Sequence, residues 1–313
     1  MGQWQQNRAF LFSHPRTASN LLTRMLSAQP DWQVSDYLFF DAFQYTRDAF
    51  WGVDLDDAPV SARQEHDKLM DQGHERLGEV LCSSLADRKH LLLKDHAHLV
   101  QPVETTYDDT ETAPTAQLNS TIGSYAQTWR TNPTVFSDSL MLSWTPIILI
   151  RNPILIFESW LRAEGDPYPD LESQYANIYT TLRFQRYIFD WYASHPDTPL
   201  EPIVLDADDV IERQHVVEKL CDAIGMDKEK LLYTWESTPM PAKFQANERF
   251  KRFLQSIQNS TGVDRSKVSG NVTLDDREEQ WRETFGWDRA LTLARRVRES
   301  WPDYEYLHSM RLR

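Results

Sequence analysis

The chain has 313 residues, of which 33 are basic and 47 acidic, so its formal net charge is −14. A charge this negative argues against a nucleic-acid binder, which needs a basic surface for phosphates. Any anionic ligand must therefore be held by a few local cations. Hydrophobic residues make up 41% of the chain and aromatic residues 12%, which allows a large ordered core and excludes a disordered protein.

Two further classes are excluded by the residues at hand. The amino-terminal end, MGQWQQNRAF, has no charged region followed by an apolar one, and no apolar run approaches the roughly 20 residues of a membrane span. Cys82 and Cys221 each stand alone, which excludes a disulfide framework or a zinc knuckle. We expect a cytoplasmic protein, a monomer or homodimer, that acts without membrane or nucleic acid.

Short apolar runs alternate with helical patterns along the chain. The runs predict buried parallel strands at residues 9–13, 91–94, 146–151 and 202–206. The helical patterns lie at residues 20–29, 60–86, 153–162, 171–194, 209–224 and 287–308. This alternation predicts an α/β fold with three αβα layers around a parallel sheet of about five strands, with ligands at the carboxyl ends of the strands.

We expect residues 1–313 to form a single domain. The segment 101–143 is rich in Thr, Ser, Asp and Asn, has no sustained period and lies between two predicted strands. It is therefore expected to be a polar lid or insertion over the carboxyl edge of the sheet. A helical carboxyl-terminal part is expected from residue 242 onward.

The first predicted strand is followed by the loop His14-Pro15-Arg16-Thr17-Ala18-Ser19-Asn20 and then by a helical pattern. A strand, a tight loop with a cation and hydroxyls, and a helix start together suit an anion. Arg16 would supply the charge, and Thr17, Ser19 and Asn20 would supply donors. The same residues also fit an ordinary loop in which Ser19 or Asn20 caps the helix. No GxxxxGK[ST] or GxGxxG pattern is present, which excludes the usual nucleotide loops.

This loop resembles the 5′-phosphosulfate-binding loop of the sulfotransferase family. Ala18 replaces the usual glycine of that loop, and Arg16 replaces the lysine of the cytosolic enzymes. Leu21 stands where those enzymes have an adenine-stacking tryptophan. The resemblance runs from residue 9 to residue 262 and implies a topology like that of the P-loop NTPases.

A second motif strengthens the resemblance. The third predicted strand ends in Arg151-Asn152-Pro153, and Ser159 follows eight positions after Arg151. Sulfotransferases bind the 3′-phosphate of their donor with this arrangement. The guanidinium fork of Arg151 suits a phosphate, and Pro153 suits the first turn of a helix.

The second predicted strand ends in Lys94-Asp95-His96-Ala97-His98. Alternation places Lys94, His96 and His98 on one face if the strand continues that far. In sulfotransferases this strand ends in Lys-x-His, which Lys94 and His96 match, and the histidine is the base. The alternatives are a pair of metal ligands, a solvated strand end, or His98 as the base. We expect the His98 side chain to turn outward where the chain leaves the sheet.

The resemblance implies transfer of a sulfuryl group from 3′-phosphoadenosine 5′-phosphosulfate to a hydroxyl of a small, apolar or aromatic metabolite, without a metal. In the implied mechanism His96 accepts the proton, with Lys94 beside it, and Arg16 stabilises the departing phosphate. Residues 16–20 with Arg151 and Ser159 would bind the donor.

Two other functions stay open. The same fold could serve an elimination or another group transfer in secondary metabolism, or it could be a non-enzymatic module that binds a nucleotide or a protein partner. The aromatic residues between 37 and 51 could line an apolar acceptor pocket or pack in the core.

Overall fold

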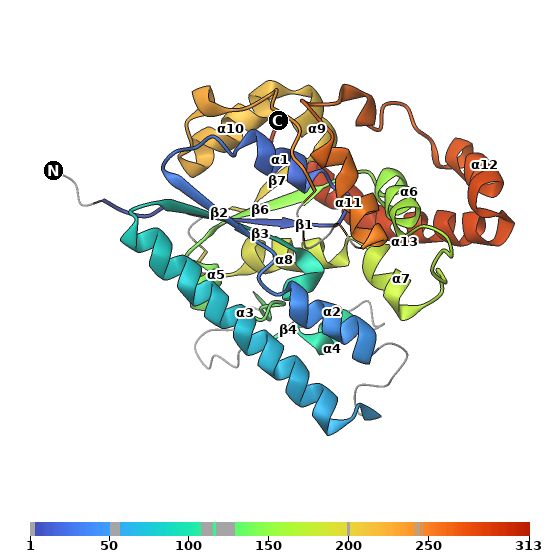
Figure 1. The fold of residues 1–313 in the computed structure, drawn as a ribbon, viewed down its shortest axis with the longest axis horizontal. Coiled ribbons are helices and arrows are strands. Elements are labelled where there is room, and N and C mark those ends of the chain that lie inside the picture. Colours follow the sequence, from blue (N-terminus) through green and yellow to red (C-terminus); the bar gives the residue numbers. More distant parts are fainter. Residues whose placement is uncertain are drawn as a thin grey trace, which may run out of the picture. The chain divides into compact units, whose positions relative to one another are not determined.

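The computed structural model describes residues 4–50, 57–107, 115–116, 129–198, 201–240, 242, 245 and 247–313. A five-stranded parallel sheet has the strand order β2-β3-β1-β6-β7 and is flanked by helices, which confirms the predicted α/β fold (Figure 1). Its strands are β1 (Arg8–Ser13), β2 (Trp32–Asp36), β3 (His90–His96), β6 (Thr145–Ile150) and β7 (Ile203–Asp206).

Strand β2 was not predicted from the sequence. It is an edge strand, and of its residues Trp32 alone is buried, so it has no continuous apolar run. A strand with one face open to solvent reads as a mixed polar segment.

The longer helices are α2 (Phe40–Ala49), α3 (Val60–Ala86), α6 (Pro153–Glu164), α8 (Arg183–Ser194), α10 (Gln214–Ile224), α11 (Glu248–Gln258), α12 (Leu274–Phe285) and α13 (Trp287–Ser309). The shorter elements are α1 (Ser19–Met25), α4 (Val103–Tyr107), α5 (Asp138–Met141), α7 (Gln174–Tyr179), α9 (Ala207–Glu212), the 3₁₀ turns η2 (Ala97–Val100), η3 (Lys228–Lys230) and η5 (Arg265–Lys267), and the strands β4 (Thr115–Ala116) and β5 (Trp129–Arg130).

The chain divides into two compact units that alternate along the sequence. The first contains Met1–Ser13, Asp31–Ile148 and Arg183–Ile203, and the second contains His14–Pro30, Leu149–Leu182 and Val204–Arg313. The single domain expected from the sequence stays a prediction. So does the polar lid, because residues 108–114 and 117–128 of that segment lie outside the described residues.

In the first unit, β3 lies between β1 and β2 and pairs with both in parallel. The register places Ser13 opposite His96 and Asp36 opposite Lys94. Four side chains from three strands are thereby gathered at the carboxyl ends of the strands, where ligands bind in sheets of this kind.

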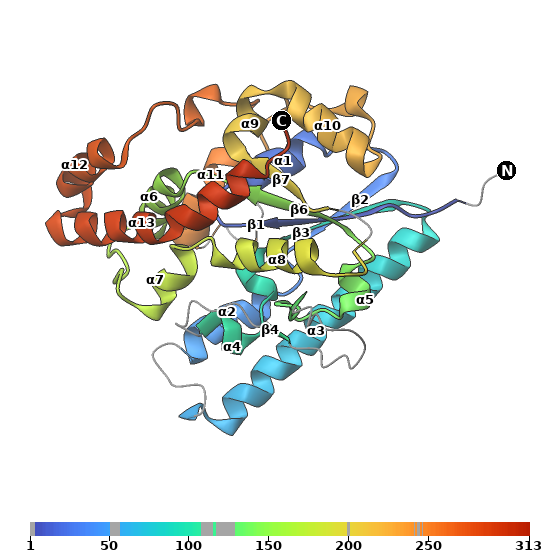
Figure 2. The ribbon, with the colours of Figure 1, turned by 180° about the vertical axis from the view of Figure 1, so that it is seen from behind.

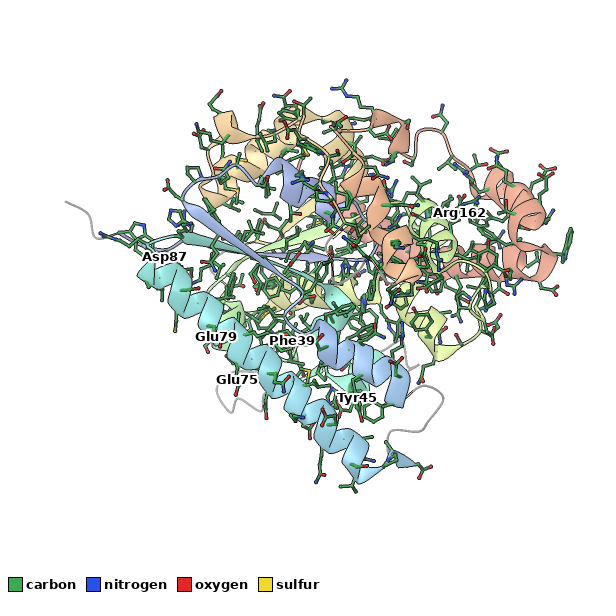
Figure 3. All side chains as sticks on the ribbon, in the orientation of Figure 1. Phe39, Tyr45, Glu75, Glu79, Asp87 and Arg162 are labelled. Atoms are coloured by element: carbon green, nitrogen blue, oxygen red, sulfur yellow. The ribbon has the colours of Figure 1, made fainter. Side chains whose placement is uncertain are left out.

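Helix α3 of this unit has an amphipathic sequence, with charged residues on one side and small or apolar residues on the other. Glu75 and Glu79 are exposed on its outer side, and the exposed Asp87 follows its last residue, whereas Gly73 and Leu77 are buried (Figure 3). Gly73 is required for close packing, because a Cβ atom there would lie 2.5 Å from Cδ1 of Phe39. The amphipathic pattern therefore gives both the helix and the face that it buries.

In the second unit, α13 packs against α12 and α6, and α11 packs against α6 (Figure 2). Two helices predicted as continuous are interrupted. The one predicted at 171–194 breaks at Thr180, which leaves helical geometry at φ −120° and ψ 39°, and the one at 209–224 breaks at Arg213. The break at Thr180 has a sequence cause, because the β-branched pair Thr180-Thr181 has low helix propensity.

Cys82 is exposed and Cys221 buried, and both are free thiols.

Among the described residues, no helix has the length and apolar character needed to span a membrane.

Candidate functional site

The loop after β1 is built from left-handed backbone positions in the second unit. Arg16 has φ 71° and Ala18 has φ 62°, although neither is a glycine. The His14 carbonyl accepts from the Thr17 amide at 3.3 Å and from the Thr17 hydroxyl at 2.7 Å, which closes the loop. Ser19 is buried and Asn20 half-buried, and together they begin α1. A loop with alternating backbone hands turns successive N–H groups toward one concave side, which suits an anion.

Ala18 makes a stability prediction possible. An alanine in the left-handed region costs about 1–2 kcal/mol, a cost that glycine does not have. Replacing Ala18 by glycine removes this cost, but glycine also has more conformational freedom in the unfolded chain, which offsets part of the gain in stability. Ala18→Gly should therefore raise the free energy of unfolding by about 1 kcal/mol. Urea unfolding measures it, with Ala290→Gly in the right-handed helix α13 as a control that should lose stability. A fall at Ala18 would contradict the left-handed loop.

The Arg16 side chain joins the loop to α6 and α11. Its Nε donates to the Ser159 hydroxyl at 2.9 Å, and one Nη donates to the Phe253 carbonyl at 2.8 Å. The guanidinium carbon lies 5.5 Å from the centre of the Phe253 ring. Burial, and then the nearby charge of Arg151, lower the pKa of Arg16 to about 10, so it keeps its proton at neutral pH.

Arg151 follows the end of β6 and contacts the same loop. Its guanidinium donates to the Arg16 carbonyl at 2.9 Å and to the Lys267 carbonyl at 2.6 Å. Burial lowers the pKa of Arg151, and Asp208 and Asp206 act against this shift. Its Nε is buried without a hydrogen-bond partner among the described residues.

The local sequence explains how Arg151 and Ser159 come to lie at one site. Asn152 caps α6 by accepting from the Ile154 amide at 3.0 Å, and Pro153 occupies the first turn. The helix therefore starts directly after Arg151 and carries Ser159 two turns later to the Arg16 side chain. The structure thus brings the Arg16 side chain onto the Ser159 hydroxyl and the Arg151 side chain onto the Arg16 carbonyl.

An open cavity of about 790 Å³ adjoins Lys267 in the second unit. It is lined by Gln255, Ser256, Asn259, Ser260, Thr261, Gly262, Val263, Asp264 and Lys267. The contribution of Phe253 and Lys267 was missed by sequence reasoning, because a main-chain carbonyl has no sequence signal.

His96, the predicted base, lies at the end of β3 in the first unit and is half-buried. Its Nδ1 lies 2.9 Å from the hydroxyl of the fully buried Ser13, and its ring centre lies 5.1 Å from that of Tyr37. Its backbone amide donates to the Asp95 carboxyl at 2.9 Å. Burial raises the pKa of Asp95 to about 8, so this carboxyl is mostly neutral at pH 7.

Lys94 is only 1% exposed, and its ammonium is bound within the protein. Its Nζ lies 3.3 Å from an Asp36 carboxylate oxygen and 4.3 Å from the centre of the Tyr37 ring. Burial acts to lower the pKa of Lys94, but Tyr37 and Asp36 outweigh it and the pKa is raised. Tyr37 itself has φ 55°, a left-handed conformation that is rare for a bulky residue.

The expectation that His98 turns outward is wrong. Strand β3 ends at His96, and the 3₁₀ turn η2 follows, so the alternation of faces does not extend to His98. His98 is 2% exposed, with its ring edge-on to Phe43 at 4.8 Å and stacked with His96 at 5.7 Å.

The aromatic run after β2 is largely core. Phe39, Phe43 and Phe50 are buried, whereas Tyr37 and Phe40 are half-buried. Trp51 lies outside the described residues.

The positions of Ser13 beside His96 and of Asp36 beside Lys94 were not predicted from the sequence. Asp36 lies on the strand that was not predicted, and Ser13 reads as an ordinary strand end.

The chain is 31% identical to a protein named sulfotransferase ppzF from Metarhizium majus (strain ARSEF 297), over 98% of this chain and 97% of that protein. It is 29% identical to the protein of the same name from Metarhizium rileyi (strain RCEF 4871), over 98% and 96% of the two chains. No protein-family model matches the chain.

Among solved structures, the sulfotransferase domain of the Synechococcus PCC 7002 olefin synthase aligns with a TM-score of 0.43 and 16% identity, over 91% of this chain and 98% of that one. A sulfotransferase from Alicyclobacillus acidocaldarius aligns with a TM-score of 0.36 and 12% identity, over 82% and 97% of the two chains.

Proposed function

The chain belongs to the sulfotransferase family, and from this premise we propose that it transfers a sulfuryl group from 3′-phosphoadenosine 5′-phosphosulfate to a hydroxyl of a small, apolar or aromatic metabolite. The observation that carries the proposal is the contact of the two predicted phosphate motifs through Arg16, Arg151 and Ser159. The charge of Arg151 lowers the pKa of Arg16, so a bound anion would stabilise both cations. In a chain of net charge −14, such local cations are what an anionic donor requires.

The donor phosphates would replace main-chain carbonyls. The Arg16 and Arg151 guanidiniums now donate to the carbonyls of Phe253, Arg16 and Lys267. A charged phosphate oxygen is a stronger acceptor than a neutral carbonyl, so exchange of partners is favourable. The buried Nε of Arg151 supplies a further donor. Arg151 and Ser159 would take the 3′-phosphate, and Arg16 with residues 17–20 would take the 5′-phosphosulfate.

In the proposed step, His96 removes the proton of the acceptor hydroxyl while its oxygen forms a bond to sulfur. The bond from sulfur to the bridging phosphate oxygen breaks, and the leaving bisphosphate nucleotide keeps the electron pair. Arg16 stabilises this charge without donating a proton, because its pKa of about 10 keeps it protonated. Lys94 holds the Tyr37 ring, which flanks His96, in place.

The acceptor class follows from the surroundings of the proposed base. The rings of Tyr37 and His98 contact His96, and Phe43 packs on His98. Of these rings, those of Tyr37 and His96 are only half-buried and can meet an acceptor, which favours a flat or apolar one. The net charge of the chain disfavours a polyanionic acceptor.

Calorimetry with 3′-phosphoadenosine 5′-phosphate against 5′-AMP tests the donor assignment. We expect a preference for the bisphosphate of about ten- to a hundredfold, because one charge-assisted contact contributes roughly 1.5–3 kcal/mol. Binding should also raise the melting temperature. Equal affinity for the two nucleotides would contradict the 3′-phosphate site.

A second candidate is a non-sulfating reaction on the same fold, and the departures at Ala18 and Leu21 favour it. The two candidates are separated by product analysis with a ³⁵S-labelled donor. Label in the product supports sulfation, whereas an altered acceptor without label supports elimination or another transfer.

A further inference from the structure

We propose that Ser13 is a positioning residue that fixes the His96 ring in the tautomer with its proton on Nδ1, so that Nε2 is the nitrogen that accepts a proton. This inference rests on the proposed function, in which His96 is the base. The evidence lies within the first unit, where β1 and β3 pair in parallel.

The sheet register fixes the two side chains against each other. Ser13 is the last residue of β1 and lies opposite His96, the last residue of β3. Ser13 is 0% exposed, and its Oγ lies 2.9 Å from Nδ1 of His96. A fully buried hydroxyl between two strand ends has little freedom to exchange its partners for water.

The direction of this hydrogen bond follows from the second partner of the hydroxyl. Ser13 Oγ also lies 3.3 Å from the Asp95 carbonyl oxygen, which can only accept. A hydroxyl has one proton, so a hydroxyl that donates to Asp95 must accept from His96. Nδ1 then carries the hydrogen, and the lone pair of the neutral ring is on Nε2.

The carboxyl group of Asp95, the residue before His96, does not orient the His96 ring. The Asp95 side chain accepts the backbone amide of His96, and burial keeps it mostly neutral. The ring is therefore oriented by a neutral hydroxyl. If the opposite tautomer were present, Nε2 would carry a proton and could not accept one from the substrate.

Nitrogen-15 NMR of the histidine rings tests the proposal without any turnover. In the wild-type protein, at a pH where the ring is neutral, we expect the His96 signals of an Nδ1–H tautomer. In Ser13→Ala we expect a mixture of tautomers, and kcat lower by about tenfold, the value of one ordinary hydrogen bond. Nucleotide affinity should stay close to that of the wild type, because the Ser13 hydroxyl contacts the Asp95 carbonyl and the His96 ring and no residue proposed to bind the donor.

Ser13→Thr, which keeps the hydroxyl, is the rescue variant and should restore both the tautomer and kcat. An Nε2–H tautomer in the wild type, or an unchanged tautomer in Ser13→Ala, would overturn the proposal, whether or not the variants are active. An inactive wild type with Nδ1–H on His96 would instead contradict the proposed function and leave the role of Ser13 supported.

Discussion

Replacing His96 by alanine is expected to lower kcat by about 10²- to 10⁴-fold, with nucleotide affinity close to that of the wild type. General-base catalysis contributes a rate factor of that order, and loss of the imidazole removes it. His96 stands at the carboxyl end of β3, half-buried, with a ring that Ser13 and Tyr37 hold on two sides. The measurement is transfer of labelled sulfuryl groups to whichever hydroxylated acceptor gives turnover.

Two histidines of the same region serve as controls. His90→Ala changes the same residue type at the opposite end of β3 and should leave kcat near the wild-type value. His98→Ala should act mainly on stability, because His98 is buried against Phe43 and its removal leaves a cavity. An inactive His98→Ala with an active His96→Ala would assign the base to His98. Full turnover in both variants would show that this segment supplies no base.

The fold could be predicted where the sequence itself contains a local pattern of apolar residues. The helix predicted at 60–86 has these bounds in the structure because its amphipathic pattern is intrinsic to the segment. Strand β2 escaped prediction because its identity depends on pairing with β3, and its own residues do not form an apolar run. The break at Thr180 has a local cause in the β-branched pair Thr180-Thr181, whereas the residues around Arg213 carry no such signal.

The residues of the candidate site likewise fall into those that lie in a local sequence motif and those whose position depends on the tertiary structure. Arg16, Arg151 and Ser159 were found because each lies in a motif with a defined position after a strand. Ser13 beside His96 depends on the register of two strands that are distant in sequence, which composition does not encode. The direction of His98 depends on how the chain leaves β3, since a 3₁₀ turn does not continue the alternation of a strand.

Replacing Arg151 by alanine is expected to weaken binding of the bisphosphate nucleotide by about ten- to a hundredfold and to affect 5′-AMP far less. The charge-assisted contact that is lost contributes roughly 1.5–3 kcal/mol. Arg162→Ala is the matched control (Figure 3), because Arg162 lies on α6 in the same unit but pairs with Glu158. Calorimetry with both nucleotides separates the effect on the 3′-phosphate from a general loss of affinity. Equal weakening for the two nucleotides would mean that Arg151 supports the loop through the Arg16 carbonyl and does not read the 3′-phosphate.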